Sequence, residues 1–452
     1  MKKQITKEKN NKLYKEKRIK NKIDKKALSP KDKLEKRNLT LYSLYKMLSY
    51  DLLFYYIVSF LFFTEIKGMT ASEVLFMDAF YPFFKLIFEP LLVFYIDSKS
   101  KKTCLITGNF CIFLSILIII FTKNPYWLII VNLFMAIGFA IKDQVESTFA
   151  YSLITEKNEK EKRDLFLKID GKSTSKYHIF SSISSLIASM LYVINPYIPF
   201  ILSASALFIA TFICFFFKIY DDHKTKAVIK DFKNYKKELK DSFNFINNSQ
   251  RLTYLIVFHA LFHGIFSTMV SSRNSLLTDI DISTTSRGIL FALFSLIAFS
   301  SSKKAIHIHS KFKNHTLNAF SNMYYLLMLA IGLITFNNNL GFISYLLLFI
   351  CMGFQYIIEA PYKTIINQYL SNITTPEIST KIFSITGFIV QLFSLTFMLL
   401  TSLILKYFTT SISFIFIGGL AFIGFTILSC KMKKVVGLRP EDYDEKEIFI
   451  RH

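Results

Sequence analysis

Long apolar runs alternate with short polar turns along almost the whole chain after residue 40. A helix needs about 20 mostly apolar residues to cross a hydrocarbon layer about 30 Å thick, and runs of this length recur. The pattern therefore predicts an all-α membrane protein with twelve transmembrane helices. The expected spans lie near residues 42–65, 71–96, 103–122, 126–153, 176–195, 197–217, 252–276, 284–302, 316–336, 339–368, 382–405 and 411–430.

Lysine and arginine residues outside the spans fall on alternate sides of the predicted membrane. The basic segments on the side of the N-terminal tail are Lys2–Lys46, Lys99–Lys102, Lys157–Lys176, Lys218–Lys240, Lys303–Lys313 and Lys431–Arg451. The opposite loops carry only isolated basic residues, namely Lys67, Lys123, Arg273, Arg287 and Lys406. Because cytoplasmic loops are enriched in Lys and Arg, we expect both termini in the cytoplasm and an even number of spans.

The spans divide into two pseudo-symmetric six-helix bundles, residues 41–217 and residues 252–430. Between them, residues 218–251 are basic and carry apolar residues at three- and four-residue steps, which predicts an interfacial cytoplasmic helix. Residues 1–40 are rich in Lys and Asn and have little to bury, so we expect a disordered tail or a fraying helix. Residues 431–452 are a second cytoplasmic tail.

Composition narrows the classes of function. The chain has 452 residues, 52% of them hydrophobic, which is too apolar for one water-soluble domain of this length. The net charge is +23, and the lysines that produce it lie between the apolar runs. We therefore expect contact with anionic lipid headgroups and none with nucleic acid. The five cysteines lie in or at the ends of apolar runs without a CxxC pair, which predicts free thiols and no disulfide, metal or cofactor.

A polar stripe crosses the second span. Asp78, Pro82, Lys85 and Glu89 are spaced by four, three and four residues, so they line one face of an otherwise apolar helix. A charge at the centre of a bilayer costs about 2.5–3.5 kcal/mol, so such residues usually face a partner or a watery cavity. The stripe therefore predicts one wall of a path through the membrane.

The fourth and tenth spans, six apart, show a weak internal repeat. Each contains a Gly-Phe pair, Gly138-Phe139 and Gly353-Phe354, followed by a polar stripe. The two stripes consist of Lys142, Asp143 and Glu146 in the fourth span and of Gln355, Glu359 and Lys363 in the tenth. Two related halves around a site near the membrane midplane are a common plan of transporters.

The charges in these stripes allow two interpretations. The pairs Lys85/Glu89, Lys142/Glu146 and Glu359/Lys363 stand four residues apart on their helices. Each pair can neutralise itself within one helix, or it can bind a proton or a substrate, and the spacing does not decide between these roles. Asp51 and Asp78 have no such neighbour. If the chain is proton-coupled, Glu89 and Glu146 are the preferred titrating groups, because a carboxyl group away from water takes up a proton more readily.

Two histidines of the seventh span, His259 and His263, have the four-residue spacing of a metal-binding pair. No third ligand is in view, so we expect histidines that hydrogen bond or face a cavity, with no bound metal.

The turn after the second span resembles the best-known motif of the major facilitator superfamily, G-x-x-x-D-x-x-x-R/K-R/K. Asp97, Lys101 and Lys102 match the acid and the basic pair, whereas Val93 stands at the glycine. The arrangement of twelve spans with a central cytoplasmic loop also resembles that of the same family. The fifth span departs from its drug/proton antiporters, because it has no Gly between Ser181 and Asn195.

The resemblance implies alternating access between two bundles, with Asp97, Lys101 and Lys102 as a cytoplasmic gate latch between the second span and the far half. Physically, an acid at a helix end can pair with a neighbouring helix in one state and lose that pair in the other. The alternative is a plain turn whose lysines serve only to orient the helices.

These features predict a secondary active transporter in the plasma membrane or the bacterial inner membrane, working as a monomer. Its expected substrate is a small amphipathic or hydrophobic solute, exported by use of an ion gradient, with H⁺ as the expected coupling ion. The alternatives are a polytopic membrane enzyme acting on lipid-linked substrates and a carrier-derived sensor without transport. We expect no enzyme, because no His/Asp/Glu constellation gathers at one face. A nucleotide-driven pump is excluded by the lack of a G-x-x-x-x-G-K-[ST] loop.

Overall fold

The computed structural model of the chain describes residues 30–154, 159–218, 240, 243–244, 246–304, 315–336, 340–373 and 376–435. The regular elements of these residues are all helical. Those of the first half are α2 (Pro30–Ser49), α3 (Tyr56–Leu61), the π-helix η1 (Phe62–Ile66), α4 (Ala71–Asp78), α5 (Phe80–Ser98), α6 (Lys101–Phe121), the 3₁₀-helix η2 (Pro125–Trp127), α7 (Leu128–Ser152), α8 (Glu159–Ile194) and α9 (Ile198–Phe215). Those of the second half are α11 (Gln250–Asp279), α12 (Thr284–Lys303), α14 (Thr316–Phe336), α15 (Phe342–Ile373), α16 (Pro376–Tyr407) and α17 (Thr410–Val435).

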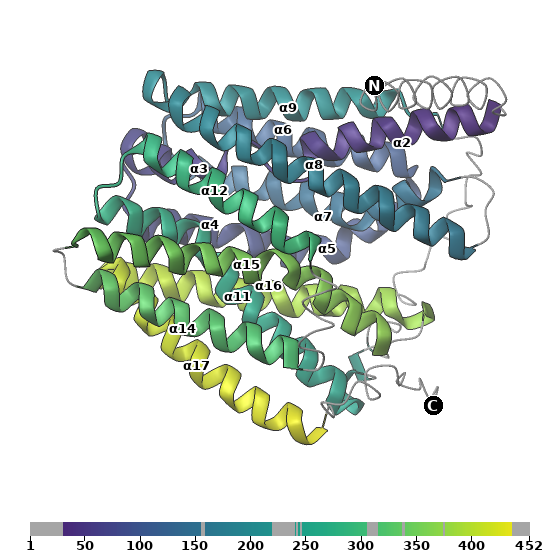
Figure 1. Cartoon of the computed structure of the whole chain (residues 1–452). Coiled ribbons are helices and arrows are strands. Elements are labelled where there is room, and N and C mark those ends of the chain that lie inside the picture. Colours follow the sequence, from purple (N-terminus) through teal and green to yellow (C-terminus); the bar gives the residue numbers. More distant parts are fainter. Residues whose placement is uncertain are drawn as a thin grey trace, which may run out of the picture.

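The helices form two lobes (Figure 1). In the N-lobe, α2 to α9, helix α6 packs on α7 and α9, and α5 packs on α7. In the C-lobe, α11 to α17, helix α11 packs on α16 and α17, and α14 packs on α15 and α17. The lobes meet where α8 lies along α12 and where α4 and α5 lie along α16. Helix α2 begins and α17 ends on one side of the molecule, which we call the terminal side; the other is the far side.

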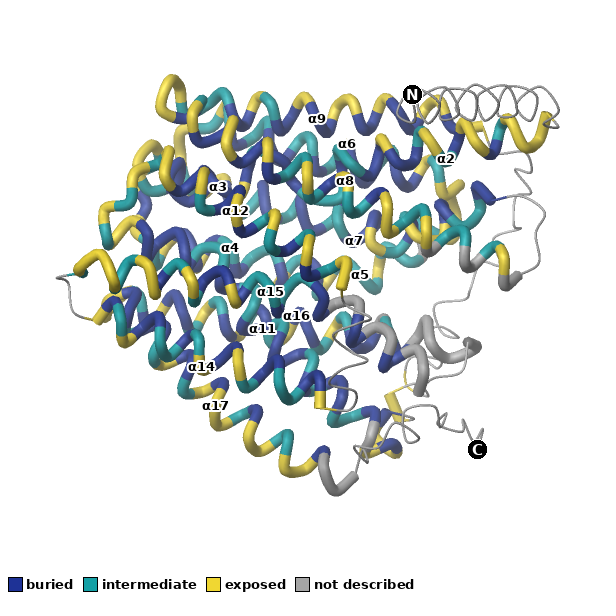
Figure 2. Tube along the Cα trace, in the orientation of Figure 1, coloured by how far each residue is buried: buried dark blue, intermediate teal, exposed yellow. Residues whose placement is uncertain are grey.

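Eleven helical segments of the described residues are long and apolar enough to cross a membrane. They match the second to the twelfth expected spans, so the predicted all-α membrane fold is confirmed. Large apolar side chains lie exposed on many of these helices, such as Phe208 of α9, Leu333 of α14 and Phe422 of α17. Figure 2 shows exposed and buried positions alternating along the outer helices, as expected for helices with one face toward lipid.

The first expected span differs from the prediction, because its helix is interrupted. Helix α2 ends at Ser49, and the chain turns before α3 begins at Tyr56. In this turn the Asp51 carboxylate accepts hydrogen bonds from the backbone N–H of Leu52 and the Tyr56 hydroxyl, both at 2.8 Å. Such a side chain offers the backbone an alternative to helical hydrogen bonds. Phe54 has a φ of 63°, a conformation that costs a non-glycine residue about 1–3 kcal/mol.

Two other boundaries differ from those expected. Residues 30–40, predicted to belong to the N-terminal tail, form the first turns of α2. Helix α8 begins at Glu159 rather than near residue 176, so the basic segment before the fifth span is largely helical. Residues 1–29, most of the expected interfacial helix in residues 218–251, and residues 436–452 lie outside the described part.

The second span is divided into α4 and α5 at Asp78. Pro82 has no N–H to donate to the carbonyl of Asp78, so one helical hydrogen bond cannot form there. The Asn132 side chain of α7 donates to the preceding carbonyl, that of Met77, at 2.7 Å. The irregularity is therefore set by the sequence and held by a side chain from a neighbouring helix.

The two lobes touch closely on the far side. Ser72 of α4 and Ser402 of α16 exchange hydrogen bonds, each hydroxyl donating to the other's backbone oxygen at 2.8 Å. Helices α8 and α12 approach so closely at Gly288 that an added Cβ would lie 1.8 Å from the Ser189 hydroxyl and 3.1 Å from the Ser185 backbone oxygen. Only glycine allows this approach of the two helices.

We therefore expect Gly288→Val to disfavour this arrangement of the lobes. Overpacking of a close contact typically costs about 1–3 kcal/mol, so the thermal midpoint of the purified protein in detergent should fall. Gly419→Val of α17 is the matched control, because an added Cβ there meets no atom of the described chain within 4 Å. An equal midpoint for the two variants would contradict the close α8–α12 contact.

Candidate functional site

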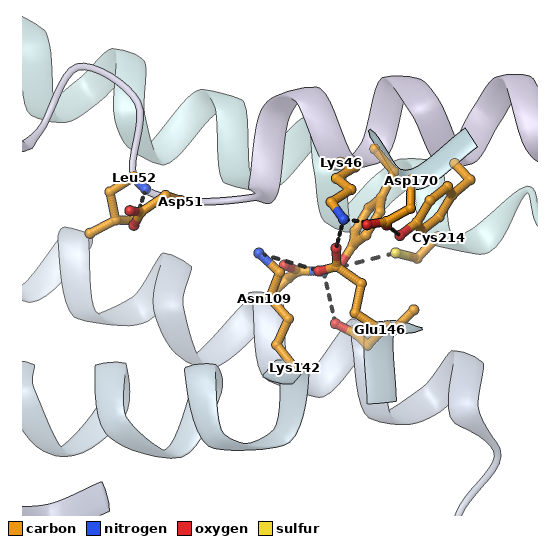
Figure 3. Close-up of polar contacts among 11 residues, drawn as sticks. Lys46, Asp51, Leu52, Asn109, Lys142, Glu146, Asp170 and Cys214 are labelled. Atoms are coloured by element: carbon orange, nitrogen blue, oxygen red, sulfur yellow. Dashed lines mark hydrogen bonds and ion pairs between the residues drawn. The ribbon is translucent and has the colours of Figure 1, made fainter. Parts of the chain in front are cut away.

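A cluster of opposite charges is buried in the N-lobe (Figure 3). Lys46 of α2 forms an ion pair with Asp170 of α8, and its Nζ lies 3.7 Å from a carboxylate oxygen of Glu146 on α7. Lys142, one turn before Glu146 on α7, is 3.7 Å from the other oxygen of that carboxylate. The Tyr42 hydroxyl donates to Asp170 at 2.9 Å. Two cations therefore share two anions inside one lobe, which offsets the cost of burying each charge.

This cluster corrects one expectation and refines another. Lys46 was assigned to a basic segment outside the spans, but its side chain is only 6% exposed. The predicted Lys142/Glu146 pair is present, but Glu146 of α7 also lies next to Lys46, which comes from another helix, α2. Because Lys46 lies inside the expected span 42–65, the sequence could have indicated that its side chain is buried. Asp170 could not be found in this way, because the expected fifth span began only near residue 176.

A second ion pair joins α5 to α7 next to the surface between the lobes. Lys85 donates to Asp143 at 2.7 Å, and the Asp143 side chain is 49% exposed. The direct partner of Lys85 is Asp143 on α7, whereas Glu89, the neighbour considered from the spacing, acts on Lys85 only at longer range. Helix spacing shows only local neighbours, and Asp143 is a long-range one.

Glu89 lies at the boundary of the two lobes. A Cβ added to Gly387 of α16 would be 3.5 Å from a Glu89 carboxylate oxygen, so this side chain of α5 reaches the C-lobe. Its backbone oxygen accepts from the Gln144 side chain at 3.3 Å. No ion pair or hydrogen bond of the Glu89 carboxylate occurs within the described residues. This carboxylate therefore stands against the opposite lobe without a close ion pair, and Lys85 acts on it only from a longer distance.

Asp78, the other acid of the stripe in the second span, also contacts the opposite lobe. Its carboxylate accepts a hydrogen bond from the Ser271 hydroxyl of α11 at 2.7 Å. The structure thus brings both Asp78 and Glu89 to the surface between the lobes, as a wall of the expected path requires.

The C-lobe holds its own buried ion pair. Arg273 of α11 binds the Glu359 carboxylate of α15 with two nitrogens, one of them at 3.3 Å, and donates to the Gln355 side-chain oxygen at 2.9 and 3.1 Å. The Tyr324 hydroxyl donates to the same Glu359 carboxylate at 2.6 Å, and the guanidinium lies 4.7 Å from the Tyr356 ring centre. The Arg273 side chain is 1% exposed.

Arg273 and Arg287 correct the distribution of charge expected from the sequence. Both were placed in the loops opposite the tails, but they lie in helices and are buried. Arg287 donates to the Ile282 backbone oxygen and the Thr278 hydroxyl near the end of α11, at 2.9 and 3.0 Å. Glu359 takes Arg273 as its partner; the side chain of Lys363, its expected neighbour, lies outside the described part.

The predicted gate residues bind within their own lobe. Lys102 donates to the backbone oxygens of Phe215 and Phe217 at the end of α9, at 2.8 and 3.0 Å, and Lys101 donates to that of Thr148 at 3.3 Å. Lysines at a helix C-terminus satisfy free carbonyls and complement the helix dipole. Within the described residues, Asp97 forms no hydrogen bond or ion pair with the C-lobe, so the latch across the lobes stays a prediction.

The paired histidines of α11 contact polar and aromatic side chains. Nδ1 of His263 lies 3.2 Å from the Ser394 hydroxyl of α16, and the His259 ring lies 5.7 Å from the Tyr362 ring. No group of three or more metal-ligating side chains gathers in the described ranges. His307 and His309, in the basic segment Lys303–Lys313, lie outside them.

A groove of about 460 Å³ runs between the first turns of α2 and the first half of α8, on the terminal side. Its walls carry both charges and hydroxyls and consist of Asp32, Glu35, Lys36, Leu39, Thr40, Ser43, Leu165, Ile169, Lys172, Ser173 and Lys176. The exposed lysines suit an anionic headgroup, so the expected lipid contact stays a prediction for this region.

The fold consists of two helical lobes, each with a buried ion pair, and carboxylates lie on the surface between the lobes. This arrangement is typical of two-lobed membrane transporters. The chain belongs to the Major Facilitator Superfamily, whose family model matches residues 44–357. The resemblance inferred from Asp97, Lys101 and Lys102 is thereby confirmed. No curated protein sequence matches the chain.

Solved structures of similar fold are transporters of the same type. The nucleoside transporter NupG is 10% identical, with a TM-score of 0.67 over 88% of this chain and 99% of its own. A D-xylose–proton symporter is 11% identical, with a TM-score of 0.65 over 90% and 99%. A POT family transporter in complex with a thioalcohol-conjugated peptide is 12% identical, with a TM-score of 0.64 over 88% and 96%. At these identities the likeness concerns the fold alone.

Proposed function

We propose that this member of the superfamily is a proton-coupled carrier that moves a small amphipathic solute by alternating access. The observation that carries the proposal is the position of Glu89. Its carboxylate reaches Gly387 of the opposite lobe and forms no hydrogen bond or close ion pair within the described residues, while Lys85, one turn away, attracts it electrostatically. A carboxyl group at such a boundary changes its charge with the water around it, and that water changes when the lobes part.

The surroundings of Glu89 favour an amphipathic solute. The Lys85–Asp143 pair lies one turn away, and the Lys85 ammonium is 5.9 Å from the Tyr81 ring centre. Phe80, Phe84 and Phe88 continue an aromatic row on the same helix, with neighbouring ring centres 6.0 and 6.4 Å apart. Charges next to aromatic faces suit a ligand with one polar end and one apolar end. Export, as opposed to import, remains the prediction from the sequence.

Transport in sealed vesicles tests this proposal. Inside-out vesicles with an acidic lumen should accumulate radiolabelled tetraphenylphosphonium or chloramphenicol, an amphipathic cation and a neutral amphiphile. The membrane potential is held at zero with potassium and valinomycin, so that only the pH gradient drives uptake. We expect at least one compound to accumulate and to leave when nigericin collapses the gradient. If neither exceeds the level in vesicles without the protein, the proposed coupling and substrate class are wrong.

A further inference from the structure

Asp78 occupies a position that the roles of Glu89 and Glu146 leave unexplained. It ends α4 on the far side, at the interruption caused by Pro82 and held by Asn132. Its carboxylate accepts from Ser271 of the C-lobe at 2.7 Å. The hydrogen bonds between Ser72 and Ser402 also join the lobes on the far side, at the beginning of α4. Asp78 is thus an acid inside the contact that joins the lobes on the far side.

The polar groups that α4 meets here are mostly unable to ionise. They are the Ser271 hydroxyl of α11, the Ser402 hydroxyl of α16 and the Asn132 amide of α7. The phenol of Tyr55, ahead of α3, is a titratable group that interacts electrostatically with the Asp78 carboxylate. An ionised carboxylate that is shielded from water needs several donors or a cation, and the described neighbours of Asp78 supply a single hydroxyl.

Several charged groups on the elements packed around α4 have other partners, whereas the Glu89 carboxylate of α5 makes no hydrogen bond or close ion pair within the described residues. Lys85 of α5 binds Asp143, and Arg273 of α11 binds Glu359. Glu65 of η1 accepts a hydrogen bond from Tyr192 at 3.0 Å. Within the described residues, no cation pairs with Asp78.

We propose that Asp78 is a far-side latch, which holds the lobes together through Ser271 when its carboxyl is neutral and releases them when it is ionised. The inference rests on the proposed proton coupling and adds the residue that links protonation to closure of one side. When the lobes part, water replaces Ser271 around the carboxyl, and water favours the charged form. Closure removes that water, so closure and proton uptake at Asp78 support each other.

Ser271 also connects the latch to the C-lobe. It lies two residues before Arg273 on α11, and the Arg273 side chain is held by Gln355 and Glu359. A rigid helix between the two contacts lets a change at Asp78 move the α11 segment relative to the N-lobe as one body.

The test measures the distance across the far side without any substrate. Spin labels are placed on Lys123→Cys and Gly341→Cys, one on each lobe, in the full-length protein with its five native cysteines replaced. Pulsed electron paramagnetic resonance then gives the ratio of molecules closed on the far side to molecules open there. It is measured at about pH 5 and about pH 8.5, on either side of the pH range in which a partly buried carboxyl group titrates. We expect acid to raise this ratio about tenfold, a typical coupling between two sites.

Asp78→Asn, which mimics the neutral acid, should stay closed at both pH values, with a change of at most about twofold. Glu73→Gln, the matched control, removes an exposed acid of the same helix that caps α4 through Thr70, and it should respond like the parent protein. Ser271→Ala, a milder change, should lower the closed fraction in acid. A parent-like pH response of Asp78→Asn would overturn the latch. Because no substrate is present, that result is distinct from a failure of gradient-driven transport.

Discussion

Glu89→Gln is expected to abolish accumulation driven by the pH gradient, while the protein still inserts into the membrane. Glutamine keeps the size of the side chain and its contact near Gly387, but it cannot take up or release a proton. Uptake of tetraphenylphosphonium or chloramphenicol, whichever the parent protein accumulates, should fall to the level of vesicles without the protein. Initial rates at equal amounts of inserted protein make the measurement.

Exchange of labelled for unlabelled compound, with no pH gradient, provides the control for this variant. Exchange needs the substrate site and the movement of the lobes but no net proton transfer, so Glu89→Gln should retain it. Glu73→Gln, which changes an exposed acid outside the lobe boundary, should keep both activities. Gradient-driven uptake by Glu89→Gln at the parent rate would rule out a proton role for this residue.

Arg273→Met should destabilise the protein by about 3–5 kcal/mol, because it leaves the Glu359 carboxylate buried without its cation. The side chains of Arg273 and Glu359 are 1% and 6% exposed, so water cannot easily replace the lost partner. Gln355 also loses the group to which its oxygen is bonded. Thermal or denaturant unfolding of the purified protein in detergent measures the effect.

Two further variants separate the loss of the ion pair from the change of shape. The double variant Arg273→Met with Glu359→Met removes both charges and should recover most of the stability, since apolar replacement of a buried pair is often neutral. Lys85→Met removes the cation of a pair whose acid is 49% exposed, so it should cost only about 0–1 kcal/mol. A small effect of Arg273→Met, similar to that of Lys85→Met, would contradict a buried C-lobe pair.

The helices could largely be predicted from the sequence, because lipid demands long apolar runs whose backbone groups are satisfied internally. The errors arose where polar residues modify a helix without ending its run. Asp51 interrupts the first span through its own hydrogen bonds, which an average of apolarity does not reveal. The opposite error placed the start of the fifth span near residue 176, although the polar residues from Glu159 onward continue the helix.

The candidate site was predictable in its residue types but only partly in its pairings. The acids of the second span do lie between the lobes, as their common helix face indicated. Spacing along a helix suggested Lys85/Glu89 and Glu359/Lys363, whereas the described contacts join Lys85 to Asp143 and Glu359 to Arg273. Such partners come from other helices, and their proximity depends on packing that no local pattern encodes. Arg273 was missed because a basic residue near the end of an apolar run resembles a loop residue.

If polar residues at membrane depth face a water-filled space between the lobes rather than lipid, a reagent dissolved in water should reach them. Ser147 offers a direct probe, because it is exposed and lies one turn after Asp143 on the same face of α7. The variant Ser147→Cys, in the protein with its native cysteines replaced, is treated with a membrane-impermeant maleimide from either side of the membrane. The variant Leu333→Cys, at a 67% exposed apolar position of α14, is the lipid-facing control. We expect labelling of position 147 from the terminal side and none at position 333. Protection of both positions from the aqueous reagent, with equal labelling by a lipid-soluble maleimide, would contradict a water-filled space between the lobes.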